Sequence, residues 1–156
     1  MDGAPSKVCA TPEVSAQFSL AGWGWHNEAS IHVLRLILSG VFDRFPKLQV
    51  ISGHWGEMVP FYLQRLDVMV PVKLTGLSAT ITETYRNHVW VTPSGMFDRP
   101  HFDFIREVIG VERLIWAVDY PYLTLDGTRE FLDGHPLTEE ETDAITHRNA
   151  ERLFHL

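Results

Sequence analysis

The chain has 156 residues, of which 45% are hydrophobic and 21% charged, and these values suit one globular domain with a buried core. Its formal net charge is −7, it has no Lys/Arg run, and no apolar run approaches the roughly 20 residues of a membrane span, which argues against binding to nucleic acid or membrane. Cys9 is the single cysteine and the first ten residues lack a secretory pattern, so we expect a cytoplasmic protein without an internal disulfide.

The first 26 residues predict little regular structure. Residues 1–22 show no clear hydrophobic period and contain scattered Pro and Ser, so we expect an irregular leader, followed by the folded domain over residues 23–156. The Gly- and Trp-rich residues 21–26 are expected to form a loop. Two interpretations of this loop stand side by side. Trp25 and His26 line the mouth of a pocket, or the tryptophans anchor the loop on the core.

Helices and strands are predicted to alternate through the rest of the chain. In chain order we expect a helix over residues 27–42, a strand over 48–52, a helix from Glu57, a short helix near 81–87, a strand over 88–92, a helix from Pro100, a strand over 114–118 and a last helix after Thr138. The first helix should begin at Asn27 as N-cap and be buried on most of its circumference, and Thr138 with Glu141 should form a capping box.

This alternation predicts parallel strands that are joined by helical crossovers, which is an α/β fold. The predicted strands are short and apolar throughout, so both faces of the sheet should be covered. The carboxyl ends of parallel strands meet at one edge of a sheet, and active sites of α/β enzymes lie there.

Polar side chains follow each predicted strand at that edge. His54 and Glu57 follow the first strand, Thr92 and Ser94 the second, and Asp119 the third. A histidine and an aspartate brought together in this way can bind a divalent metal or relay a proton. Structural roles are the alternative: a hydrogen-bonded strand-end histidine, a loop-organising aspartate, and a glutamate placed to suit a helix dipole. Spacing alone leaves both interpretations open.

Several motifs resemble those of the amidohydrolase superfamily. Gly53-His54-Trp55-Gly56-Glu57, followed by Pro60 and Arg65-Leu66-Asp67, is similar to its G-H-x-G-E…P…R-x-D block. The segment from Arg113 to Pro121 resembles the last-strand block with its aspartate, and Asn149-Ala150-Glu151-Arg152-Leu153-Phe154 resembles the closing N-A-x-R-L-F. The closer similarity, from about Trp23 onward, is to the metal-dependent decarboxylase branch that holds γ-resorcylate decarboxylase and aminocarboxymuconate-semialdehyde decarboxylase.

The resemblance implies a fold and an activity. The fold would be the C-terminal portion of a TIM (β/α)8 barrel, about strands six to eight with their helices. His54 is implied as the catalytic histidine that activates water or relays a proton, and Glu57 as its carboxylate partner. Asp119 is implied to bind a divalent metal, zinc or manganese, and to couple to His54. The implied reaction is decarboxylation of a small aromatic or unsaturated carboxylic acid, with hydrolysis as the alternative.

The sequence also departs from the family pattern. The family takes further metal ligands from a first-strand H-x-H or E-x-H pair and from a fifth-strand histidine, and this sequence has neither motif. Asp119 would therefore hold a metal poorly, because stable zinc sites use three or four protein ligands. Three barrel strands would also leave unpaired edges and an uncovered apolar interior. We expect the chain to form a homo-oligomer or to pair with the missing barrel half. A non-catalytic truncated chain, with an oligomerisation role or none, is the other alternative.

Overall fold

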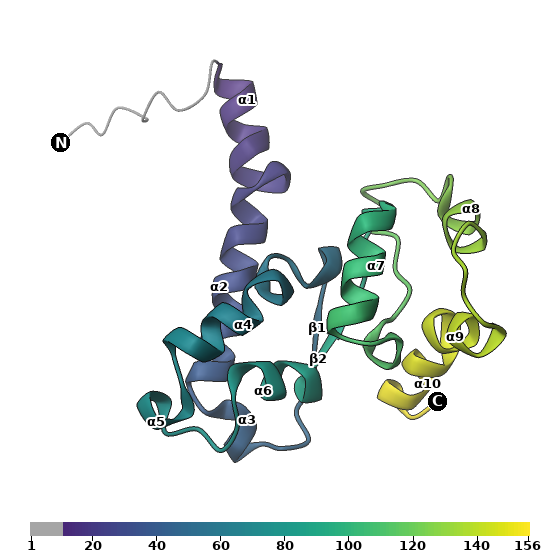
Figure 1. Ribbon diagram of the computed structural model, residues 1–156. Helices are drawn as coiled ribbons and strands as arrows, with labels where there is room; N and C mark the ends of the chain where they lie inside the picture. The colour runs from purple at the N-terminus through teal and green to yellow at the C-terminus, as the bar shows by residue number, and fades with distance from the viewer. Residues whose placement is uncertain (1–10) are drawn as a thin grey trace.

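Two short parallel strands lie at the centre of a mainly helical fold in the computed structural model, which describes residues 11–156 (Figure 1). β1 (Val50–Ser52) pairs with β2 (Val89–Val91) in the register Val50–Val89. The prediction of parallel strands with a helical crossover is thereby confirmed for this pair.

The third predicted strand, over residues 114–118, is wrong beyond its first residues. Leu114 forms one parallel bridge with Val91, and the Ile115 N–H still donates to the Val91 carbonyl at 3.0 Å. The ladder stops there, because its next donor would be the N–H of residue 93, which is Pro93 and has none. The Trp116 N–H points to the opposite edge, where it donates to the carbonyl of Ile145 at 3.0 Å.

The N-terminal part of the described chain is helical, so the irregular leader predicted over residues 1–22 is wrong from Pro12 onward. α1 (Pro12–Gln17), the π-helical η1 (Phe18–Gly22) and α2 (Gly24–Leu38) form a rod that projects from the body (Figure 1). Thr11 caps this rod by accepting a hydrogen bond from the Val14 N–H, and Pro12 suits the first turn. The prediction for Cys9 lies outside the described residues.

α2 differs from its prediction in start and burial. It begins at Gly24 rather than after Asn27, so Trp25 and His26 belong to a helix and not to a loop. Its buried side chains are confined to one stripe, whereas Leu36 and Leu38 on other sides are 38% and 42% exposed. The predicted burial of most of its circumference is therefore wrong.

The remaining elements keep the predicted order, with short helices over residues 72–75 and 128–133 that were not predicted. They are α3 (Val41–Arg44), the 3-10 turn η2 (His54–Gly56), α4 (Val59–Met69), α5 (Val72–Thr75), α6 (Ile81–His88), α7 (Arg99–Val108), η3 (Val111–Arg113), α8 (Thr128–Asp133), α9 (Glu139–Asp143), η4 (Ala144–Arg148) and α10 (Asn149–Phe154). The capping box of Thr138 and Glu141 is confirmed. Glu57 precedes α4 rather than opening it, with a backbone φ of 58°.

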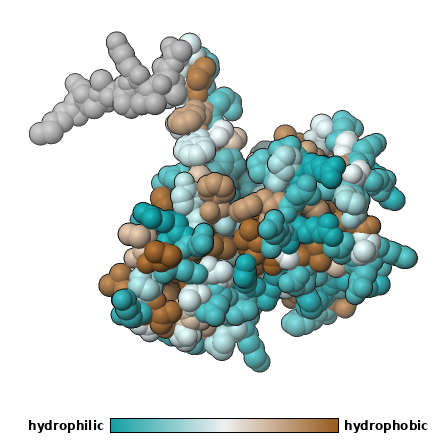
Figure 2. Space-filling model, in the orientation of Figure 1, coloured by the Kyte–Doolittle hydropathy of each residue, from teal (hydrophilic) through white to brown (hydrophobic). Residues whose placement is uncertain are grey.

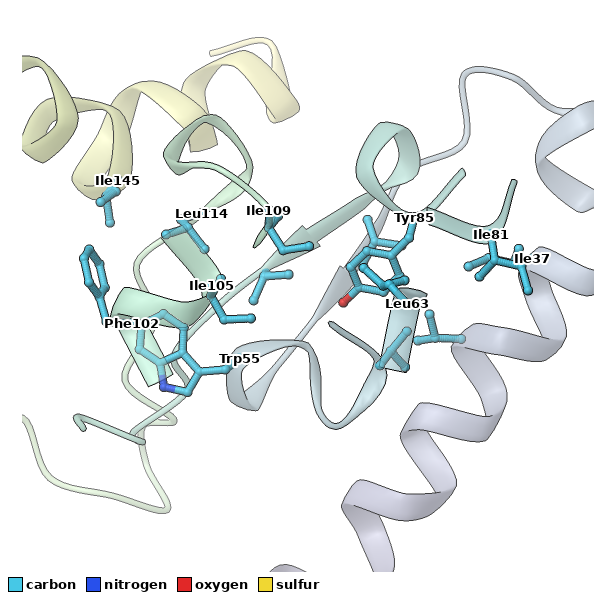
Figure 3. Packing of buried hydrophobic residues seen from close by; sticks show 14 of the residues in the cluster. Ile37, Trp55, Leu63, Ile81, Tyr85, Phe102, Ile105, Ile109, Leu114 and Ile145 are labelled. Carbon is cyan, nitrogen blue, oxygen red and sulfur yellow. The ribbon is translucent and has the colours of Figure 1, made fainter. Parts of the chain in front are cut away.

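The core lies on both sides of the strands (Figure 3). Trp55, Phe102, Ile105 and Leu114 pack on one side, and Ile37, Leu63, Ile81 and Tyr85 on the other. All three residues of β2 are buried, as predicted for a strand covered on both faces. β1 contradicts that prediction, because Ile51 is 45% exposed.

No helix in the described part of the chain is both long enough and apolar enough to cross a membrane.

Candidate active site at the carboxyl ends of the strands

The turn that leaves β1 carries four consecutive residues with left-handed backbone angles. His54, Trp55, Gly56 and Glu57 have φ values of 44°, 59°, 78° and 58°. Such angles are unfavourable for side chains other than glycine, so the surrounding structure must hold them in place. Trp55 is the anchor: its side chain is buried, its backbone N–H donates to Thr92 O at 2.8 Å, and its indole N–H donates to Met96 O at 2.6 Å.

This turn directs Glu57 inward, where it pairs with two histidines. Glu57 Oε1 lies 2.9 Å from His54 Nδ1, and Oε2 lies 2.6 Å from His26 Nδ1. The Glu57 side chain is 3% exposed, whereas the two histidines are each about one-fifth exposed. The imidazole rings meet edge-on, with centroids 4.6 Å apart. A buried carboxylate thus holds two partly exposed imidazoles at the surface of the site.

Asp119 faces the other side of His54. Its Oδ2 atom is 3.9 Å from His54 Nε2, and its side chain is 34% exposed. The loop of Asp119 is closed by its own carbonyl, which accepts hydrogen bonds from the N–H groups of Tyr122 and Leu123. Gly95 allows this loop to approach the end of β2, because a Cβ there would lie 3.3 Å from the Val118 carbonyl.

The second strand contributes a pair of hydroxyls. Thr92 Oγ1 and Ser94 Oγ lie 2.7 Å apart, and Ser94 packs against Gly53 at the start of the His54 turn. The ends of β1 and β2 and the loop of Asp119 therefore converge, as the sequence predicted for these side chains. The structure brings together His54, Glu57 and Asp119, the three side chains that the sequence selected.

His26 also belongs to this site, although the sequence did not select it as a catalytic or metal-binding residue. Its contact with Glu57 joins α2 to the β1 turn, and neighbouring hydrogen bonds support that junction: Ser30 Oγ donates to His26 O, and the Met58 N–H donates to Ser30 Oγ. The spacing of His26 and Ser30, four residues apart, was the available signal for a shared helix face. This spacing was not used because residues 21–26 were expected to form a loop, not a helix.

The hydrogen bonds determine how His54 carries its protons. Because Nδ1 donates to Glu57, the Nε2 atom is the nitrogen left to face Asp119. The hydrogen bond to Glu57 raises the pKa of His54 above its ordinary value. Burial opposes this rise in pKa, while the negative charges of Glu57 and Asp119 add to it. His54 therefore binds a proton more readily than an isolated imidazole, which suits it to hold one.

Two sets of side chains have donor atoms for a divalent metal. His26, His54 and Glu57 offer one ligand atom each within 4.8 Å of one another, but those atoms already pair through hydrogen bonds. Asp119 has a partly exposed carboxylate, an oxygen donor that zinc and manganese accept. The described residues thus fit a metal at Asp119 as one ligand of a larger set.

Comparison with known proteins identifies the class. The amidohydrolase family model matches residues 3–156, and the chain belongs to this family, in the branch that contains aromatic-acid decarboxylases. The decarboxylase orsB of Emericella nidulans is 37% identical in an alignment of 140 positions that covers 85% of this chain and 42% of that protein. The γ-resorcylate decarboxylase of Rhizobium radiobacter is 31% identical over 86% of this chain and 42% of that protein.

A solved structure agrees with these relatives. The 5-carboxyvanillate decarboxylase of Novosphingobium aromaticivorans, in complex with manganese and 4-hydroxy-3-methoxy-5-nitrobenzoic acid, superposes with a TM-score of 0.84 at 32% identity over 94% of this chain and 44% of that one. The chain therefore spans less than half the length of these relatives. The resemblance seen in the motifs is confirmed, and the α/β architecture with parallel strands is consistent with part of a TIM barrel.

Proposed function

We propose that this chain supplies about strands six to eight of the TIM barrel of a metal-dependent decarboxylase that acts on an aromatic carboxylic acid. The main support for this proposal is the buried Glu57 carboxylate, which holds His54 with its Nε2 atom toward Asp119. The similarity to the decarboxylase orsB and to γ-resorcylate decarboxylase supports the reaction class. The nitrobenzoic acid in the 5-carboxyvanillate decarboxylase complex supports an aromatic acid as substrate.

The reaction needs a proton at one ring carbon. When the bond from that carbon to the carboxylate breaks, CO2 leaves and the electron pair stays on the ring, where a proton must replace the lost group. His54 is proposed to take up this proton on Nε2, the nitrogen left free in its Nδ1–H form, and to deliver it to the ring carbon. Asp119, 3.9 Å away, is placed to pass the proton or to stabilise the protonated imidazole. The sum is one carboxylate and one proton consumed, and one arene and one CO2 formed.

Asp119 would hold the divalent metal together with ligands from other parts of the barrel. When bound, such a metal binds and orients the anionic groups of the substrate. Glu57 acts behind His54 and does not touch the substrate in this proposal. Its burial keeps water from competing for the His54 Nδ1–H.

The test supplies the unmatched part of the barrel. We would co-express this chain with the part of E. nidulans orsB that precedes the matched region, add Mn²⁺, and offer hydroxybenzoic acids labelled with ¹³C in the carboxylate. We expect release of ¹³CO2 by the complex. His54→Asn should lower the rate by roughly 10²- to 10⁴-fold, the usual contribution of a positioned proton donor.

His32→Asn is the matched control, because His32 lies on α2 with its side chain 66% exposed. It should leave the rate unchanged. A complex that contains both polypeptides and manganese but releases no ¹³CO2 would overturn the proposal. Cleavage of esters or amides by the same complex would favour the hydrolase alternative.

A further inference from the structure

Both ring nitrogens of His26 face hydrogen-bond acceptors. Nε2 lies 2.8 Å from the carbonyl oxygen of Ala21, and Nδ1 lies 2.6 Å from Glu57 Oε2. A carbonyl oxygen can only accept, so Nε2 must carry a proton and donate it. A neutral imidazole then has no proton for Nδ1, yet the contact with the carboxylate requires one between the two atoms.

The pair of His26 and Glu57 therefore holds one proton more than a neutral imidazole beside a carboxylate. The pair is neutral overall, with the extra proton between Nδ1 and Oε2. Hydrogen bonds of this charge-assisted kind are short, which agrees with the 2.6 Å separation. Glu57 is almost fully buried, and a buried carboxylate without a compensating proton or cation is strongly unfavourable. His26 provides that compensation from the partly exposed side.

The two histidines divide the Glu57 carboxylate between them. Oε2 lies against His26, and Oε1 accepts from His54 Nδ1 at 2.9 Å. The edge-on contact between the two imidazoles, at an interplanar angle of 78°, also restricts rotation of the His54 ring. The His54 Nε2 atom is consequently held toward Asp119.

We infer that His26 is a positioning residue of this site, which shares one proton with Glu57 and thereby fixes the tautomer and orientation of His54. The groups that face this shared proton are Glu57 and His54 from the β1 turn, with Asp119 beyond His54. Its catalytic consequence rests on the proposed decarboxylase function. The proton sharing itself does not, because it follows from the hydrogen-bond partners alone.

The first measurement needs no substitution. In the full chain labelled with ¹⁵N-histidine, long-range ¹H–¹⁵N spectra at neutral pH report which imidazole nitrogens carry protons. We expect a strongly downfield proton on the His26 Nδ1–Glu57 contact, a proton on His26 Nε2, and His54 in the Nδ1–H form. A His26 ring protonated at Nε2 alone, without the downfield signal, would overturn the inference. This measurement uses the unaltered chain, so it does not depend on whether any variant folds.

Variants then separate positioning from simple packing. His26→Leu should abolish the downfield signal and leave His54 in mixed tautomers, whereas His26→Gln, whose amide can donate to Oε2, should restore the Nδ1–H form of His54. His32→Leu on the same helix is the control and should change neither signal. An unchanged His54 tautomer in a folded His26→Leu chain would overturn the positioning role.

Activity in the co-expressed complex provides the last discriminating readout. His26→Leu should lower kcat roughly 10- to 100-fold with little change in KM, as loss of an outer hydrogen-bond partner does at other functional histidines, and His26→Gln should recover most of it. If the spectra agree but no complex releases CO2, the proposed function fails and the positioning of His54 stands. If the complex is active and His26→Leu is as active as the parent, the positioning role fails instead.

Discussion

The hydroxyl of Tyr85 occupies the space into which a side chain on Gly56 would project. A Cβ at Gly56 would collide with this hydroxyl and would lie 2.9 Å from Cγ of Pro60. The φ of Gly56 is also 78°, in the left-handed region. Tyr85, on α6, therefore limits how the turn that carries His54 and Glu57 can be built.

Gly56→Ala should destabilise the chain by about 3 kcal/mol. Roughly 1 kcal/mol comes from the left-handed backbone and roughly 2 kcal/mol from overpacking against Tyr85 and Pro60. Gly76→Ala is the control, because Gly76 has a φ of 72° but no atom within 4 Å of the added Cβ, so about 1 kcal/mol is expected. Urea unfolding of both variants checks the difference, and equal losses would contradict the steric argument.

Removing the Tyr85 hydroxyl should relieve part of that clash. This hydroxyl is buried and makes no hydrogen bond of normal geometry among the described residues, although the Ser52 side chain lies near it, and burial raises the pKa of Tyr85 above its ordinary value. Tyr85→Phe alone should leave stability unchanged or raise it by up to about 1 kcal/mol. The double variant with Gly56→Ala should be more stable than the sum of the single effects, which a double-mutant cycle measures. Strict additivity would show that the two residues do not interact.

Asp43 should titrate below the usual range for aspartate. Its carboxylate accepts hydrogen bonds from the Ser78 hydroxyl at 2.6 Å and from the Ser78 N–H at 3.1 Å, and these bonds lower the pKa of Asp43. A lowered pKa contributes stability above the pKa of the unfolded chain, and this contribution is lost as pH falls through the folded pKa. Ser78→Ala removes the hydroxyl bond and should raise the pKa of Asp43, as followed by carboxyl ¹³C shifts. An unchanged titration curve would exclude Ser78 as the cause.

Metal binding should depend on Asp119. We expect the isolated chain to bind Mn²⁺ weakly, because Asp119 is a single ligand, and we expect Asp119→Asn to abolish the bound signal in electron paramagnetic resonance. Asp126→Asn is the control, because Asp126 is an exposed loop aspartate that pairs with Thr124. Mn²⁺ bound equally by the parent and by Asp119→Asn would remove Asp119 from the proposed metal site.

The chain should associate in solution. Large apolar side chains reach its surface, including Ile51 on β1 and Phe61 on α4, which is 73% exposed. Figure 2 shows hydrophobic residues exposed in the middle of the face in view. β1 pairs with β2 alone among the described residues, so one of its edges is free to bind another strand. Analytical ultracentrifugation should give a mass above the 17.8 kDa of one chain, and Ile51→Lys should lower it. A stable monomer at micromolar concentration would contradict this expectation.

The parts of the fold that could be predicted from sequence depend on local signals. The apolar runs of β1 and β2 and the capping box at Thr138 each lie within a few residues. The convergence of His54, Glu57 and Asp119 was also predictable, because parallel strands end at one edge. The roles proposed for these three residues in catalysis stay predictions.

The errors arise where distant segments decide the outcome. The predicted third strand stops at Ile115 because Pro93 cannot donate the next ladder bond, and no pattern within residues 114–118 contains that limit. His26 meets a carboxylate 31 positions away, so its role depends on where α2 packs. The helix at Pro12 had a local cap in Thr11, but its exposed apolar side chains show no periodic buried face.

The pairing of β1 with β2 has a kinetic consequence. Val50 and Val89 are 39 positions apart, and α4, α5 and α6 lie between them, so the sheet closes a long loop. Contacts of such separation form slowly, whereas the capped helix α6 can form early. The Trp55 N–H finds its acceptor, Thr92 O, only once β2 has docked. The turn that presents His54 should therefore be among the last parts of the chain to become ordered during refolding.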